Sequence, residues 1–346
     1  MKALLLSKYR QLEVAETANP KIGEDEVLIR VEACGICGSD VHGYDGSSGR
    51  RIPPIVMGHE AAGTIVEVGS GVRGLHQGDR VTLDSTVYCG QCANCLRGQM
   101  NLCDQRQVLG VSCGEYRRAG AFAEYVAAPA RIVHKLSDSI SFPEASMLEA
   151  VAVAMHAVSL AETPPDSAAL VIGAGTIGLL ILQALRATGC SSVFITDVDS
   201  TRLKLAKELG ATETILADAD TLARISSLTG GAGVDVALEA VGRTETIKTA
   251  IQCVRKGGTV VLVGNISPEV AIPLQVVVSR QIRLQGSCAS SGEYPRAIEL
   301  MAKGAINVKP LISAIAPLED GPRWFERLYA HEPNLMKVVL VPGMHP

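Results

Sequence analysis

The stretch Val171-Ile-Gly-Ala-Gly-Thr-Ile-Gly178, followed nineteen residues later by Asp197, decides the fold. Small and β-branched residues over 168–172 predict a buried strand, and the apolar run over 177–187 predicts a helix. The three glycines between them permit a tight turn and let a pyrophosphate approach the unpaired N–H groups of the helix. A glycine-rich turn without a ligand is the alternative. The strand and the helix on either side favour a dinucleotide site.

Asp197 ends the second predicted strand, which covers 193–197. A carboxylate there accepts hydrogen bonds from the ribose hydroxyls of the adenosine half and repels a 2′-phosphate, so NAD is expected rather than NADP. An acid solvated at a strand end is the alternative. Arg202 is expected over the adenine, and the preference for NAD would weaken if it turned toward the 2′ position.

The size and charge of the chain exclude several classes of function. A chain of 346 residues suits two domains, and a formal net charge of −4 with 47% hydrophobic residues is typical of a globular protein that binds no nucleic acid. The apolar run in the N-terminal segment 1–10 is too short for a signal peptide, and the segment predicts a first strand. No stretch reaches the roughly 18 apolar residues of a membrane span. A cytoplasmic protein is expected.

The two parts of the chain differ in pattern. Short alternating runs over about 1–150, broken by glycine and proline, predict antiparallel strands in a small barrel or sandwich. Residues 143–160 are then expected to be helical. From Ser167 strands alternate with helices, which predicts a doubly wound parallel sheet. Its strands are expected at 168–172, 193–197, 213–216, 234–239, 258–263 and 281–286. Near the C-terminus a helix is expected over 294–303 and a strand over 337–341.

Four cysteines with short spacing predict a structural metal site. Cys89, Cys92, Cys95 and Cys103 lie within fifteen residues. Four thiolates suit a closed tetrahedral zinc that ties down a loop without a core of its own. An iron–sulfur cluster is the alternative, but its fourth cysteine follows after three residues and precedes proline. Disulfides are disfavoured without a secretion signal.

A second group of possible ligands lies mainly within two glycine-containing segments, Cys37-Gly-Ser-Asp-Val-His42 and Gly58-His-Glu-Ala-Ala-Gly63. A thiolate from Cys37, an imidazole from His59 and a carboxylate from Glu60 or Glu149 would hold zinc with an open fourth position, as catalytic zinc requires. Each of these residues, taken singly, is equally compatible with an ordinary buried position in the hydrophobic core. A second set of ligands in a domain that already holds zinc favours a catalytic metal.

The chain resembles the zinc-dependent medium-chain dehydrogenase/reductase family over nearly its whole length. The resemblance is carried by these two segments, by Gly78-Asp-Arg-Val81, by the four-cysteine lobe and by the glycine motif. Within it the polyol branch is most similar, because the segment 147–157 resembles its Glu-Pro-Leu-x-Val-x-x-His-Ala motif, with Ala150 in place of the proline. The resemblance implies a GroES-like catalytic domain (1–152 and 288–346) and a Rossmann domain (153–287).

The resemblance also implies roles for single residues. Cys37, His59 and one of Glu60 or Glu149 are implied as ligands of a catalytic zinc, with Asp40 orienting His59. Ser39 and His42 resemble a relay that carries the proton of the alcohol to solvent through the nicotinamide ribose; a turn hydroxyl and a surface histidine are the alternatives. The cofactor-binding residues are expected to be Gly173, Gly175, Thr176, Ile177, Gly178, Asp197, Arg202, Val241, Gly264 and Ser287.

The implied function is NAD-dependent oxidation of a secondary alcohol of a sugar alcohol, with one catalytic and one structural zinc, in a homodimer or homotetramer. 2,3-Butanediol or L-threonine dehydrogenation is the alternative, followed by a zinc-independent reductase and a non-enzymatic NAD-binding protein. Tyr44, Arg50 and Arg51 are candidate substrate contacts. For Arg50 and Arg51, a solvated pair of arginines on a loop is the favoured interpretation.

Overall fold

The computed structural model describes residues 1–113, 116–164 and 166–344, and the chain divides into two compact units. Unit 1 comprises Met1–Glu149, Ser290–Ala302 and Val308–Pro346. Unit 2 comprises Ala150–Ala289 and Lys303–Asn307. Across the described ranges, no helix combines the length and the apolar composition needed to cross a membrane.

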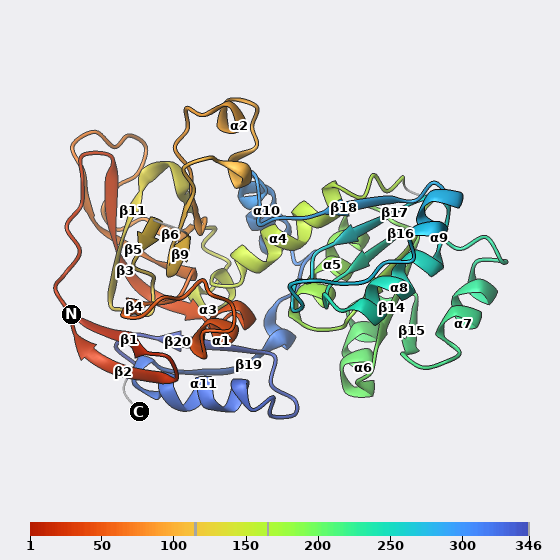
Figure 1. Cartoon of the computed structure of the whole chain (residues 1–346). Helices are drawn as coiled ribbons and strands as arrows, with labels where there is room; N and C mark the ends of the chain where they lie inside the picture. The colour runs from red at the N-terminus through yellow and green to blue at the C-terminus, as the bar shows by residue number, and fades with distance from the viewer. Residues whose placement is uncertain (114–115, 165, 345–346) are drawn as a thin grey trace. The chain divides into compact units, whose positions relative to one another are not determined.

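Unit 2 is built on a parallel sheet of six strands in the order β15-β14-β13-β16-β17-β18. Its strands are β13 (Ala168–Ile172), β14 (Ser192–Asp197), β15 (Glu213–Leu216), β16 (Val234–Glu239), β17 (Val254–Leu262) and β18 (Arg283–Gly286). Its helices are α5 (Thr176–Ala187), α6 (Ser200–Glu208), α7 (Thr221–Leu228), α8 (Thr244–Cys253) and α9 (Leu274–Ser279), which pack along the sheet (Figure 1).

The strand order reverses at β13, which pairs with β14 on one side and with β16 on the other. Such a switch point leaves a crevice beyond the carboxyl ends of the strands, where doubly wound folds bind ligands. The strands are apolar because helices cover them; Ala169, Leu170 and Val171 are fully buried. The predicted doubly wound parallel sheet is confirmed, and β17 begins four residues earlier than the predicted 258–263.

Unit 1 is mainly β-structure. Its largest sheet has the order β12-β6-β5-β3-β20-β19, with β11 also paired to β3. These strands are β3 (Glu26–Gly35), β5 (Glu60–Val68), β6 (Arg80–Leu83), β11 (Tyr125–Pro129), β12 (Val133–Lys135), β19 (Ile312–Pro317) and β20 (Lys337–Val341). Smaller sheets contain β1 (Lys2–Lys8), β2 (Gln11–Glu16), β4 (Ile55–Val56), β7 (Thr86–Val87), β8 (Gln107–Val108), β9 (Val111–Cys113) and β10 (Tyr116–Arg118).

Short helices complete unit 1. They are α1 (Gly38–Tyr44), α2 (Ala93–Leu96), α3 (Phe142–Ala145), α10 (Tyr294–Ala302) and α11 (Gly321–Tyr329), with 3-10 turns η1 (Met100–Leu102), η2 (Ala130–Ile132), η3 (Lys309–Leu311) and η4 (Leu318–Asp320). The helix α4 (Leu148–Ser159) begins in unit 1 and continues into unit 2.

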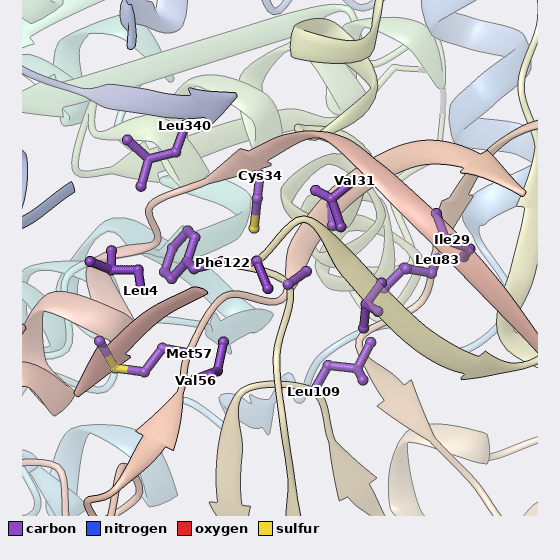
Figure 2. Packing of buried hydrophobic residues seen from close by; sticks show 14 of the residues in the cluster. Leu4, Ile29, Val31, Cys34, Val56, Met57, Leu83, Leu109, Phe122 and Leu340 are labelled. Atoms are coloured by element: carbon purple, nitrogen blue, oxygen red, sulfur yellow. The ribbon is translucent and has the colours of Figure 1, made fainter. Parts of the chain in front are cut away.

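The core of unit 1 joins residues from distant parts of the chain. Leu4, Val31, Phe122 and Leu340 are among the buried side chains of one apolar cluster (Figure 2). Cys34 belongs to the same cluster and is fully buried, so it packs as a small apolar residue. The C-terminal strand β20 thus closes the core that the N-terminal strands begin.

Two details differ from the sequence-based expectations. Residues 143–160 form two helices, α3 and α4, because Ser141 caps α3 through Glu144 and the hydroxyl of Ser146 donates to the carbonyl of Pro143 where α3 ends.

The predicted catalytic domain contained all residues from 288 onward, whereas the contacts of Lys303–Asn307 place that segment in unit 2. There the amide of Gln183 pairs with the backbone N–H and C=O of Asn307.

Candidate active site and metal centres

The possible metal ligands lie at one edge of the large sheet of unit 1, where strand β3 ends and its neighbour β5 begins. Strand β3 ends at Gly35, opposite Glu60 at the start of its antiparallel neighbour β5, and β20 pairs with the same end of β3. Antiparallel strands place the end of one beside the beginning of the next. Residues far apart in the sequence therefore meet at this edge.

Cys37, His59 and Glu60 are brought together there. One ligand atom of each lies within 4.8 Å of the others. His59 and Glu60 are buried, and Cys37 is partly exposed at the N-terminus of α1. Zinc lies about 2.0–2.3 Å from thiolate, imidazole and carboxylate ligands, so one ion can bind all three. The donor set fits a catalytic zinc.

Gly58 explains how the chain enters this site. Its φ of +93° lies in the left-handed region, and an added Cβ would come within 2.8 Å of the backbone and ring of Phe122. Only glycine adopts this φ readily and leaves out the Cβ that would clash with Phe122. It turns the chain so that His59 and Glu60 follow directly on the metal-binding edge.

Asp40 holds the surroundings of the site in place. Its Oδ1 lies 3.3 Å from Nδ1 of His59, and its Oδ2 accepts a hydrogen bond from the backbone N–H of Cys37 at 3.3 Å. Burial opposes ionisation of Asp40, but the adjacent His59 and Arg51 hold the pKa of its carboxyl well below its usual range. Because Nδ1 of His59 faces this carboxylate, Nε2 is the ring nitrogen left for a metal.

Lys337 pairs with Glu60, an interaction that the sequence analysis missed. Its Nζ lies 2.7 Å from Oε1 and 2.5 Å from Oε2 of Glu60, and it donates to the carbonyl of Ile36 at 3.2 Å. Both side chains are buried. Burial lowers the pKa of Lys337, but the negative charges of the Glu60 carboxylate and the Cys37 thiolate raise it above its ordinary value.

Glu149 lies outside the cluster of close ligand atoms among the described residues. Its Oε1 instead accepts a hydrogen bond from the hydroxyl of Ser85 at 3.1 Å. Burial raises the pKa of Glu149, and so does the negative charge of Glu60. Nearby Asp84 is buried, and burial raises the pKa of its carboxyl to about 7. Of the two glutamates that the sequence left open, the geometry places Glu60 with Cys37 and His59.

The two residues of the predicted relay lie on α1. Ser39 is exposed, and its Oγ accepts a hydrogen bond from Nη2 of Arg51 at 3.0 Å. His42 is exposed one turn further along. The expectation of a solvated arginine pair is wrong for Arg51, which is only 3% exposed, whereas Arg50 is exposed.

Tyr44 is buried rather than directed to a ligand. Its ring packs against those of Phe325 and Tyr329, with ring centroids 5.9 Å apart in both pairs. Its hydroxyl donates to the carbonyl of Arg10 or to the carboxylate of Glu326. The packing of this side chain gives it a structural role.

The four cysteines of the predicted structural site converge, with one sulfur of each within 4.8 Å of the others. Cys89 and Cys95 have their sulfurs 4.0 Å apart, and the backbone N–H of Cys89 points to the sulfur of Cys103 at 3.2 Å. Backbone N–H groups of Gln91 and Cys92 lower the pKa of the Cys89 thiol to about 6. Four converging sulfurs in a short lobe fit a tetrahedral zinc.

The glycine motif forms the expected turn in unit 2. Gly173 follows β13 with a φ of +97°, and its N–H donates to the carbonyl of Thr196 at 2.8 Å. A Cβ on Gly178 would overlap the carbonyl oxygen of Gly173. Gly175, Thr176 and Ile177 are partly exposed at the N-terminus of α5. Their N–H groups suit a pyrophosphate.

Asp197 lies at the carboxyl end of β14, beside this turn. One carboxylate oxygen accepts from the N–H of Ala174 at 2.6 Å and the other from the N–H of Asp199 at 2.8 Å. Each oxygen retains a lone pair for a ribose hydroxyl. Nε of Arg202 lies 3.6 Å from the carboxylate of Asp199, so this pairing is an alternative to the expected position over the adenine.

Val241, Gly264 and Ser287 follow β16, β17 and β18 at the same edge of the parallel sheet. A Cβ on Gly264 would clash with the backbone of Val241, so the two loops touch. Ser287 Oγ is buried and has no hydrogen-bond partner among the residues that the structure describes. The sequence missed Glu239, a fully buried carboxylate that accepts from the N–H groups of Val241 and Gly242.

The missed residues share a physical reason. Glu239 and Lys337 each lie at the end of an apolar strand, where a charge ordinarily marks only the boundary of the strand. Arg51 follows another arginine in a loop. Their partners are distant in the sequence or are backbone groups, so no local pattern reveals them.

Two family profiles match the chain. The profile described as "Alcohol dehydrogenase GroES-like domain" matches residues 23–138. The profile described as "Zinc-binding dehydrogenase" matches residues 176–303. Together they include Cys37, His59, the four-cysteine lobe and most of the cofactor-binding residues.

Relatives with assigned names act on polyols and sugar acids. The chain is 35% identical to sorbitol dehydrogenase of Bacillus subtilis, with 99% of this chain and 98% of that protein covered. It is 37% identical to L-idonate 5-dehydrogenase of Vitis vinifera, with 90% and 86% covered.

Solved structures show the same fold over the whole chain. Galactitol-1-phosphate dehydrogenase from Escherichia coli has a TM-score of 0.91 at 29% identity, with 99% of this chain and 100% of that chain covered. An alcohol dehydrogenase from E. coli CFT073 complexed with NADH has a TM-score of 0.91 at 29% identity, with 99% of each chain covered. A zinc-binding dehydrogenase from Sinorhizobium meliloti bound to NADP has a TM-score of 0.88 at 32% identity, again with 99% of each covered.

Proposed function

Because the chain belongs to the zinc-dependent medium-chain dehydrogenase/reductase family, we propose that it oxidises a secondary alcohol of a sugar alcohol to a ketone. It is a zinc-dependent dehydrogenase of the alcohol and polyol class that uses a nicotinamide cofactor. The observation that carries the proposal is the close approach of Cys37, His59 and Glu60. The named relatives support a polyol as the substrate class.

Cys37 and His59 hold the catalytic zinc in this proposal, and Glu60 is its third or exchanging ligand. The zinc supplies Lewis-acid chemistry, which lowers the pKa of an alcohol hydroxyl. Asp40 fixes the ring of His59 through Nδ1, and Lys337 controls the position of Glu60. Cys89, Cys92, Cys95 and Cys103 hold the structural zinc.

Ser39 and His42 move the proton of the alcohol. The hydroxyl of Ser39 accepts it while passing its own hydrogen on toward His42, whose exposed imidazole releases a proton to solvent. A nicotinamide cofactor, which the glycine turn before α5 and Asp197 would hold, would supply the redox chemistry. Glu149 supports the site through Ser85 rather than binding the metal directly.

NAD is the proposed cofactor. Asp197 presents a carboxylate at the end of β14, which suits two ribose hydroxyls and repels a 2′-phosphate. The substitution Asp197→Ser should lower the preference for NAD over NADP at least tenfold in kcat/KM. An unchanged ratio would assign the choice of cofactor to other residues.

We further propose a homodimer or homotetramer that resides in the cytoplasm. Strand β18 is an edge of the parallel sheet, so one side of its backbone is available for pairing. Leu274 and Val278 on the adjacent α9 are 63% and 70% exposed. An exposed apolar surface beside a free strand edge supports association of two copies. Light scattering that shows only a monomer would reject this assignment.

The function is tested by NAD reduction with a panel of polyols, their phosphates, 2,3-diols and L-threonine, together with zinc analysis. Cys37→Ala is expected to abolish turnover, while NAD titration of the variant gives the wild-type affinity because the cofactor-binding residues lie in unit 2. Full turnover of Cys37→Ala would remove the catalytic zinc from the proposal. A clear preference for a diol or threonine would reassign the substrate.

A further inference from the structure

Arg51 is a buried cation with no role in the function described so far. Its side chain is 4% exposed, and it pairs with Asp40, whose side chain is 0% exposed. Burying an arginine is costly even when it is paired, and apolar residues often replace such pairs without loss of stability. Stability alone therefore does not account for the buried pair of Arg51 and Asp40.

The contacts of Arg51 join the two halves of the catalytic machinery. Its Nη2 donates to Oδ1 of Asp40 at 2.8 Å and to Oγ of Ser39 at 3.0 Å. The same Oδ1 of Asp40 lies 3.3 Å from Nδ1 of His59. One nitrogen atom thus connects the carboxylate behind a metal ligand with the first hydroxyl of the proton path.

The surrounding fold is shaped to admit this side chain. A Cβ on Gly43 in α1 would come within 2.9 Å of Cβ and Cδ of Arg51, and closer still to its Cγ. Gly43 has no left-handed φ that would require glycine for backbone reasons. The absence of a side chain there leaves room for the stem of Arg51. Its Nε has no hydrogen-bond partner among the described residues, so Nη2 makes the specific contacts.

The hydrogen bond to Ser39 determines what its hydroxyl can do. A serine hydroxyl has one hydrogen to donate and two lone pairs to accept with, and an arginine can only donate. Nη2 fills one lone pair, so the hydrogen of Ser39 must be donated to another group. One lone pair remains to accept a proton. A group in a proton relay must accept on one side and donate on the other, and this arrangement leaves one position for each.

We propose that Arg51 is a positioning residue for proton transfer, which fixes the Ser39 hydroxyl in its relaying orientation by tying it to Asp40. The inference rests on the proposed function, because it assigns Ser39 to the path of the alcohol proton. It goes beyond that function in giving the path a buried cationic anchor.

The test compares Arg51→Met and Arg51→Lys with the matched control Arg30→Met, which removes an arginine that is 52% exposed on β3 of the same unit. Turnover of a polyol with NAD is measured in H₂O and in D₂O, together with zinc content and NAD affinity. Arg51→Met should lower kcat about tenfold to a hundredfold, in keeping with the loss of one positioned proton transfer. KM should change much less.

Three further results are expected. The solvent isotope effect on kcat should be larger in Arg51→Met than in the wild type, because proton release becomes slower than hydride transfer. Zinc content and NAD affinity should be unchanged. Arg51→Lys should recover most of the rate, since one ammonium can donate to both Ser39 and Asp40.

Gly43→Ala provides an independent perturbation that alters no polar group. Its methyl group displaces the stem of Arg51, so it should raise the solvent isotope effect in the same direction and by a smaller amount. It also keeps the proposal testable if Arg51→Met fails to fold.

The inference is overturned if Arg51→Met behaves like Arg30→Met, or if its rate falls in proportion to lost zinc with no change in the isotope effect. Either result leaves the proposed function intact, because the wild type is still active. A wild type that reduces no NAD with any polyol would instead remove the proposed function, and the inference with it.

Discussion

Substituting Lys337 by methionine removes one partner of the buried ion pair beside the metal ligands. Lys337 and Glu60 have side chains only 4% and 1% exposed, with Nζ and Oε2 2.5 Å apart. At that distance and an effective dielectric constant of about 20, their attraction is roughly 7 kcal/mol. Desolvation of both groups offsets most of this in the intact pair. Removal of one partner leaves an unpaired buried carboxylate and should cost about 3–5 kcal/mol.

Urea denaturation at fixed zinc concentration measures this loss. Trp324 is the single tryptophan of the chain and lies on α11, so its fluorescence reports the unfolding of unit 1. The control is Lys135→Met, which breaks a largely exposed pair with Asp79 and should cost no more than about 1 kcal/mol. The double variant Lys337→Met with Glu60→Gln should be more stable than the two single losses predict, since no buried charge is left alone. A coupling energy below about 0.5 kcal/mol would refute the reasoning.

Three other predictions test separate parts of the fold. Burial raises the pKa of Asp84 to about 7 from its ordinary value of 3.8, so the folded state binds this proton more tightly than the unfolded state. Its contribution to stability is therefore present below about pH 4 and is lost as the pH rises to about 7, by at most about 4 kcal/mol. The substitution Asp84→Asn should remove this pH dependence. A difference in unfolding free energy between wild type and variant that stays constant between these pH values would contradict the prediction. Cys103→Ser should lose the structural zinc while the catalytic ion remains, as metal analysis by mass spectrometry would show; retention of both ions would exclude the four-cysteine site. Gly178→Ala should abolish NAD binding in a fluorescence titration, because its methyl group overlaps the carbonyl of Gly173, and wild-type affinity would show that the turn can relax.

The sequence predicted the parallel sheet of unit 2 because its signals are local. Each strand is a continuous apolar run, and the strand, glycine turn and helix follow one another within twenty residues of Ala168. The cysteine lobe was predictable for the same reason, since its four sulfurs converge within a single short loop.

The metal site in unit 1 was only partly predictable. Cys37 and His59 were expected from their chemistry, but Lys337 lies 277 residues from Glu60 and reaches it only because β20 pairs with the end of β3. Arg51 was expected to be solvated, because two adjacent arginines in a loop give no sign that one is buried. Long-range strand pairing determines the contact of Lys337, and packing of a loop against α1 determines that of Arg51. A linear pattern contains neither.

Charge compensation connects Lys337 to the chemistry of the site. Asp40 and Glu60 each have a buried cation as a partner, Arg51 and Lys337 respectively. A zinc ion held by Cys37 and His59 therefore meets one uncompensated negative charge, that of the thiolate, and retains about one positive charge. This residual charge favours negative charge on the alcohol oxygen.

Loss of Lys337 should change that balance as well as the stability. Glu60 without its ammonium partner would be an uncompensated negative charge beside the zinc site and would offset the residual positive charge, so the alcohol would lose its proton less readily. The rate of NAD reduction by Lys337→Met should therefore be low near neutral pH and rise at a higher pH than in the wild type. Lys337→Arg keeps the cation and should keep the wild-type profile. If Lys337→Met showed a lower rate with an unshifted profile, Lys337 would act through the packing of β20 and not through the charge of Glu60.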